Sequence, residues 1–193
     1  SKVKTTELSS NEFELVKDWA DKAISVKLSK HEFNNDFWSS NGYLRNLDSI
    51  ETWRLRNLIA ALLNDILKIP SERVQNFLRC SLLKTGQWAL DGKKVIPTVS
   101  KFRQRLKQNT LEMLDGLREY SDAVREFNEN SSKESSRILN RSVIGIEEES
   151  GLFSAPPTLI IMSPPYPGVH VIYHRWQIKG RRETPAPFWI ANS

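Results

Sequence analysis

The four residues Ser163-Pro164-Pro165-Tyr166 are the part of this sequence best suited to chemistry. The two prolines have no N–H group and a fixed φ, so the nearby carbonyl oxygens can point outward without neighbouring amides competing for them. The side-chain oxygen of Ser163 lies beside these carbonyls, and together they form a cluster of acceptors suited to an NH₂ group. Tyr166 adds a flat face on which a nucleic-acid base can stack. The residue types therefore predict a site that grips an amine on a planar ring.

The segment before these residues predicts where the site lies in a fold. Residues 158–162, Thr-Leu-Ile-Ile-Met, form a continuous apolar run with β-branched members, bounded by prolines on both sides. Such a run is typical of a short strand buried on both faces of an α/β sheet. Open α/β sheets place their ligands at strand ends. We therefore expect the Ser-Pro-Pro-Tyr motif to lie at the end of a buried strand.

The motif resembles the Ser/Asp/Asn-Pro-Pro-Tyr motif of the DNA amino-methyltransferases, of the cytosine-N4 and adenine-N6 type. The continuation over residues 167–177 and 180–184 is similar to one bacterial branch of these enzymes, and residues 2–6 are similar to the stretch that follows their cofactor-binding strands. The resemblance implies that the acceptors hold the exocyclic amine of a flipped-out base and direct its lone pair at the methyl group of S-adenosylmethionine. It implies catalytic roles for Ser163, Pro164, Pro165 and Tyr166.

Serine in the first position favours cytosine-N4, and adenine-N6 remains open. Two other classes of function also remain open. One is a non-catalytic DNA-binding or subunit module of a restriction-modification system. The other is an amino-methyltransferase acting on RNA or on a protein glutamine, although asparagine in place of Ser163 would favour the glutamine substrate more.

Basic residues near the motif predict contacts with DNA. The chain has a formal net charge of +5, which favours polyanionic partners. Because of their proximity to the predicted base pocket, Lys179, Arg181 and Arg182 are expected to touch phosphates, and His170 is expected to form a hydrogen bond or a phosphate contact. With Tyr166 they make up the predicted DNA-binding set. A second basic cluster is interpreted as solvated surface; it comprises Lys93, Lys94, Lys101, Arg103, Arg105 and Lys107.

The cofactor-binding turn expected of such an enzyme does not occur in this sequence. No Gly-x-Gly is present, so we assign no cofactor-binding residues and expect the chain to be a central or C-terminal fragment. The missing half would carry a Phe-x-Gly-x-Gly loop, and this chain alone is expected to be inactive. We predict no metal site, because His170 and His174 have neither a glutamate between them nor a third ligand.

Helical patterns fill residues 1–127, which we predict to be a helical subdomain. Capping-box spacing at Ser9 and Glu12 starts a first helix that runs to about Val26, and Asp48 with Glu51 repeats that spacing. The second helix ends at Pro70, a third runs from near Ser71 to near Gly86, and a long fourth starts near Ser100. The helix tryptophans, Trp53 included, and Cys80 are expected in the core, and Trp176 is expected either there or stacked on a nucleotide.

The remainder divides into two further parts. Residues 128–157 are predicted to be a linker with a short strand at Val143–Ile146, and residues 158–193 a partial catalytic unit. The fold class is therefore α/β, a partial Rossmann-like methyltransferase fold with a large α-helical insertion. One cysteine, no signal peptide and no membrane-length apolar run favour a cytoplasmic protein.

Overall fold

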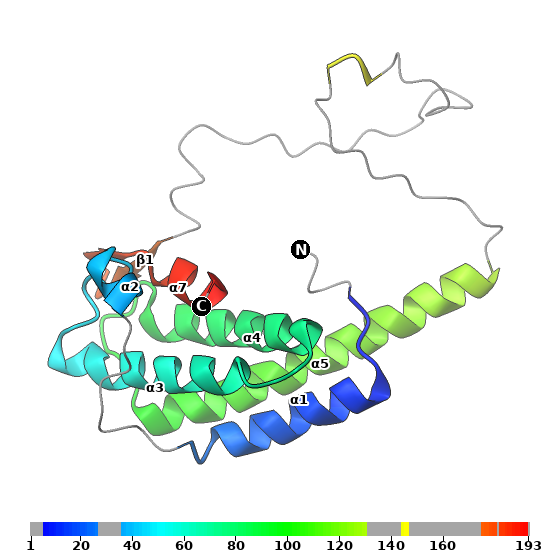
Figure 1. Ribbon diagram of the computed structural model, residues 1–193, viewed down its shortest axis with the longest axis horizontal. Coiled ribbons are helices and arrows are strands. Elements are labelled where there is room, and N and C mark those ends of the chain that lie inside the picture. The colour runs from blue at the N-terminus through cyan, green and yellow to red at the C-terminus, as the bar shows by residue number, and fades with distance from the viewer. Residues whose placement is uncertain (1–5, 27–35, 131–143, 147–174, 181, 193) are drawn as a thin grey trace.

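The computed structural model describes residues 6–26, 36–130, 144–146, 175–180 and 182–192, and they are mostly helical (Figure 1). Long helices α1, α3, α4 and α5 pack side by side and enclose the core. Short helices α2 and α7 and the strands β1 and β2 lie near one end of this bundle. The elements are α1 (Ser10–Ala23), α2 (Asp36–Ser40), α3 (Ile50–Ile66), α4 (Glu72–Leu90), α5 (Val99–Asn130), β1 (Trp176–Ile178), β2 (Arg182–Thr184) and α7 (Ala186–Asn192).

Helix α1 begins as the sequence predicts. The Ser9 N–H donates to Glu12 Oε2 over 2.8 Å, and the Glu12 N–H donates to Ser9 Oγ over 3.4 Å, so the capping box is complete. Val16, Ala20 and Ala23 are buried at helical spacing. The helix ends at Ala23, slightly before the predicted end near Val26.

Helix α3 begins one residue later than predicted. Its N-cap is Ser49, and the predicted capping box of Asp48 with Glu51 is wrong. The Asp48 carboxylate is instead paired with the guanidinium of Arg56. Trp53 is 42% exposed, so its predicted place in the core is also wrong. The buried residues of α3 are mostly branched aliphatics, and they include Leu58, Ile59, Leu62, Leu63 and Ile66.

Helix α4 continues through Gly86 to Leu90, so the predicted end near Gly86 is wrong. Ser71 caps it, accepting the Val74 N–H over 3.4 Å. Cys80 is half-buried rather than fully buried. Gly86 is buried and faces the C-terminal elements, so it serves a close packing contact instead of a helix stop.

Helix α5 spans 32 residues, which corresponds to about 48 Å at 1.5 Å per residue. Phe102, Leu106, Leu114 and Leu117 are buried against the bundle. The C-terminal part of α5 extends beyond the neighbouring helices (Figure 1). The N-terminal end of α5 therefore lies among the other helices, whereas its C-terminal end is exposed to solvent.

The chain after residue 175 packs on α4. Strands β1 and β2 form an antiparallel hairpin that pairs Trp176 with Thr184, and α7 follows directly. Trp176, Ile178, Trp189 and Ile190 are buried in the same core as the helices. Residues 175–192, which the sequence assigns to the catalytic unit, thus share a core with the helical subdomain.

The predicted strand over Thr158–Met162 lies outside the described residues. Residues 144–146 form a turn, so the described part of the predicted strand at Val143–Ile146 is not extended. Within the described residues, no helix is both long and apolar enough to span a membrane.

Candidate functional site

The catalytic motif predicted from the sequence, Ser163 to Tyr166, lies outside the described residues, as do His170 and Arg181. Of the predicted site residues, the structure describes Lys179 and Arg182. Both belong to the β1–β2 hairpin that follows the motif in the sequence. The hairpin is therefore the part of the predicted site whose geometry is known.

Lys179 lies at the turn of this hairpin. Lys179 and Gly180 have φ values of 52° and 70°, left-handed conformations that are common in the loops of β-hairpins. The Lys179 ammonium forms an ion pair with the carboxylate of Glu51, in the first turn of α3. Arg182 opens β2 and is exposed.

Several hydrogen bonds hold the hairpin on the end of the helical bundle. The Gln177 N–H donates to Asp91 Oδ1 over 2.8 Å, and the Gly92 N–H donates to the Gln177 carbonyl over 2.9 Å. The Asn46 amide donates to the Glu183 carbonyl over 2.8 Å. One of these partners, Asn46, precedes α3, and the other two, Asp91 and Gly92, follow α4. The hairpin is therefore attached to the bundle at two separate points, which fixes the position of its cations.

A groove of about 630 Å³ is lined in part by Glu51, the partner of Lys179 in this hairpin. It is lined by residues at the start of α3 and in the segment that leads into α5, namely Ile50, Glu51, Arg54, Leu55 and residues 94–100. We call it the Arg54–Lys94 groove. Arg54 and Lys94 are exposed, and no carboxylate within the described residues forms an ion pair with either. Glu51, the acid in the lining, is itself paired with Lys179.

The structure divides the second basic cluster into two sets. Three of its members have contacts within the protein: Arg103 donates to the Val26 carbonyl, Arg105 stands 6.0 Å from the Trp88 ring centroid, and Lys107 pairs with Asp21 at 2.6 Å. Lys93, Lys94 and Lys101 are exposed, as solvated surface would be. Lys94 nevertheless lines the groove, as does Glu51, the partner of the hairpin cation Lys179.

Sequence reasoning did not single out Arg54. The available signal was its spacing from Glu51, since residues three apart on a helix share a face. Nothing in the sequence indicated that Glu51 would meet Lys179, or that Arg54 would line the same groove as Lys94.

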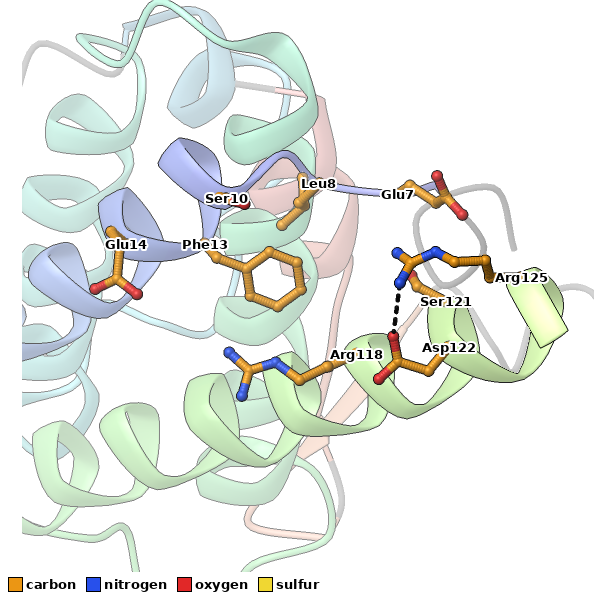
Figure 2. A pocket seen from close by; sticks show the side chains of 9 residues that line it. All are labelled: Glu7, Leu8, Ser10, Phe13, Glu14, Arg118, Ser121, Asp122 and Arg125. Carbon is orange, nitrogen blue, oxygen red and sulfur yellow. Dashed lines mark hydrogen bonds and ion pairs between the residues drawn. The ribbon is translucent and has the colours of Figure 1, made fainter.

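A second groove, of about 400 Å³, lies between the start of α1 and the distal part of α5 (Figure 2). The guanidinium of Arg118 stands 5.3 Å from the centroid of the Phe13 ring, and Arg125 pairs with Asp122 at 3.4 Å. Glu7 and Glu14 also line it. Because its lining contains three acidic side chains and two basic ones, this groove lacks the excess of positive charge that favours a polyanion.

The described residues offer no metal site: nowhere among them do three or more His, Cys, Asp or Glu side chains gather. The chain matches no protein-family model, no curated protein and no solved structure. Function is therefore inferred from the sequence motif and from the arrangement of cations around the hairpin.

Proposed function

We propose that this chain is part of a DNA amino-methyltransferase that acts on the exocyclic amine of cytosine (N4) or adenine (N6). The observation that carries the proposal is the Ser163-Pro164-Pro165-Tyr166 sequence, together with the similarity of the residues that follow it. The overall fold would be Rossmann-like, with the helical bundle as an insertion.

Each residue of the motif has a distinct role in this proposal. The hydroxyl of Ser163 and a carbonyl oxygen beside the prolines accept hydrogen bonds from the amine, which orients its lone pair. Tyr166 stacks on the base after it has left the duplex. Lys179, Arg181, Arg182 and His170 contact the flanking phosphates.

The cofactor is S-adenosylmethionine, which supplies the methyl group. The sequence contains no Gly-x-Gly turn, and neither groove of the described residues has the glycine-rich edge that such a cofactor needs for close backbone contact. We therefore assign the cofactor site to the remainder of the enzyme. This chain's own residues bind the DNA and hold the target amine.

Covalent geometry supports a shared role for the motif and the hairpin. Arg175, the first described residue before β1, follows Tyr166 by nine positions. A chain of that length spans at most about 32 Å, since an extended residue covers at most about 3.6 Å. This limit is similar to the length of one turn of duplex DNA, about 34 Å. Cations on the hairpin and a base held at Tyr166 are thus compatible with the same stretch of duplex.

Transfer of tritiated methyl groups into DNA tests the proposal, using this chain together with the cofactor-binding half. Ser163→Ala and Tyr166→Ala should each lower the methylation rate, while circular dichroism shows that the variants stay folded. Wild-type rates from both folded variants would contradict the assignment of the motif. DNA binding without methyl transfer by the wild-type protein would instead favour the non-catalytic module.

A further inference from the structure

The Arg54–Lys94 groove carries two cations, Arg54 and Lys94, with which no carboxylate of the described residues forms an ion pair. Arg54 comes from α3 and Lys94 from the segment before α5, so their meeting depends on the fold. The ion pair of Glu51 with Lys179 neutralises the acid in the lining and holds the hairpin turn next to the groove. Lys93 and Lys101 flank the lining residues in the sequence and are exposed.

The start of α5 adds to the attraction for an anion. Val99 and Ser100 line the groove and belong to the first turn of the helix. The Thr98 hydroxyl accepts the Lys101 N–H over 3.3 Å and so caps the helix, and the helix dipole still makes this end positive. This end reinforces the side-chain cations but would not define a site without them.

Apolar side chains are also exposed in the groove. Ile50 is 89% exposed and Val95 is 83% exposed, although both are large aliphatic residues. Exposed apolar surface interleaved with unpaired cations fits a ligand that has anionic groups separated by less polar ones. The sugar-phosphate backbone of DNA has this alternation, because each deoxyribose lies between two phosphates.

We propose that the Arg54–Lys94 groove binds the backbone of double-stranded DNA. Arg54 and Lys94 contact phosphates, and Ile50 and Val95 pack on the sugars. This inference rests on the proposed function, and it names the helical bundle as a DNA-contacting part of the enzyme. It also assigns Lys94 to a binding surface that sequence reasoning interpreted as merely solvated.

The test measures how affinity for a duplex depends on salt. Each phosphate contact contributes about 0.9 to the slope of log K against log [salt], so Arg54→Gln/Lys94→Gln should make that slope shallower by up to about 1.8. Arg54→Lys/Lys94→Arg keeps both charges and should retain the wild-type slope. A matched control is Lys68→Gln/Arg125→Gln. Lys68 follows the C-terminal end of α3 and Arg125 lies near the C-terminal end of α5, both away from the groove.

Three results would overturn the inference. The first is a wild-type slope for Arg54→Gln/Lys94→Gln, and the second is an equal loss in the Lys68→Gln/Arg125→Gln control. The third is that poly-L-glutamate displaces the bound duplex as well as unlabelled duplex does when both competitors are added at the same concentration of negative charge. That result would indicate an acidic protein as the ligand. The methyl-transfer assay distinguishes failure of the proposed function. If the groove variant loses slope while Ser163→Ala and Tyr166→Ala methylate normally, the DNA groove stands and the catalytic proposal alone fails.

Discussion

The far edge of the Trp176 ring occupies the place where a β-carbon on Gly86 would lie. An ideal Cβ at Gly86 would be 2.6 Å from Cη2 of Trp176 and 3.5 Å from Cδ1 of Ile190. Trp176 is only 4% exposed, so the ring cannot move into solvent without opening the contact between β1 and α4. Glycine at this position lets the hairpin and α7 approach the helix closely.

Gly86→Ala should therefore destabilise the protein. Replacing glycine by alanine within a helix normally adds about 0.5–1 kcal/mol of stability. Overpacking a closed core costs about 1–3 kcal/mol, and at Gly86 we expect this cost to exceed the helical gain. Unfolding in urea would measure the difference from wild type.

Gly116 provides the matched control, because it is a helical glycine in α5 with nothing within 4 Å of its ideal Cβ. Gly116→Ala should stabilise the protein by about 0.5–1 kcal/mol. Equal stabilisation by the two substitutions would show that the Trp176 contact adapts without cost.

The same glycine shows the limit of the sequence prediction. Glycine after an apolar pattern predicts the end of a helix, and at Gly86 this prediction is wrong because the residue serves a contact with Trp176, far along the chain. Helices with strong caps and periodic apolar residues were predicted well, as the capping box at Ser9 and Glu12 shows. Local patterns encode such elements, whereas packing between distant elements leaves no periodic mark in the sequence.

A buried pair of polar side chains joins α4 to α5. The Asn109 Nδ2 donates to Thr85 Oγ1 over 2.8 Å, and Asn109 Oδ1 has no partner among the described residues. Thr85→Val should lower the free energy of unfolding by about 1–3 kcal/mol, because it leaves a buried amide without an acceptor. In a double-mutant cycle, Thr85→Val/Asn109→Leu should cost less than the sum of the single changes, with a coupling of at least about 0.5 kcal/mol. If the losses of stability in the two single variants simply add in the double variant, Thr85 and Asn109 are not energetically coupled and this explanation is wrong.

Glu12 links the starts of α1 and α4. The Ser71 hydroxyl donates to Glu12 Oε1 over 2.6 Å, and this bond, followed by the bond from the Ser9 N–H, lowers the pKa of Glu12 below the ordinary 4.5. A carboxyl whose pKa is lower in the folded state binds protons more readily when unfolded. Its stabilising effect is therefore present above pH 4.5 and is lost as the pH falls through the folded pKa.

In the Glu12→Gln variant, the free energy of unfolding should decrease less steeply as the pH falls below 4.5. The measurement is urea unfolding at a pH well above 4.5 and at several values below it. Ser71→Ala should have a smaller effect in the same direction. Glu14→Gln is the control, because it removes a carboxylate that is 67% exposed and paired only with the nearby Lys17. An unchanged acid profile in Glu12→Gln would contradict this account of the helix junction.

The candidate site was accessible from sequence only in part. The residue types of Ser163 to Tyr166 predicted an amine-binding motif, and the charges of Lys179, Arg181 and Arg182 predicted a basic cluster that contacts phosphates. The groove was not predictable, because it brings Arg54 of α3 together with Lys94 of the segment before α5, and its acid Glu51 pairs with the distant Lys179. Charge alone did not separate Lys94, which lines the groove, from Lys107, which pairs with Asp21 within the bundle.

The roles proposed for Ser163 and Tyr166 predict different kinetic effects. In the proposed reaction, Ser163 accepts a hydrogen bond from an amine whose lone pair is turning toward the methyl donor, and that contact would strengthen in the transition state. Ser163→Ala should therefore lower kcat more than it raises KM, with turnover reduced rather than abolished because a backbone carbonyl remains. Base–aromatic stacking is worth about 1–3 kcal/mol, so Tyr166→Ala should weaken capture of the extruded base, while Tyr166→Phe keeps the ring and most activity. Ser163→Asp retains an acceptor and should preserve partial activity. The measurement is steady-state methylation of a duplex with one target site, and a Tyr166→Phe variant as impaired as Tyr166→Ala would show that the hydroxyl, not stacking, is what the reaction requires.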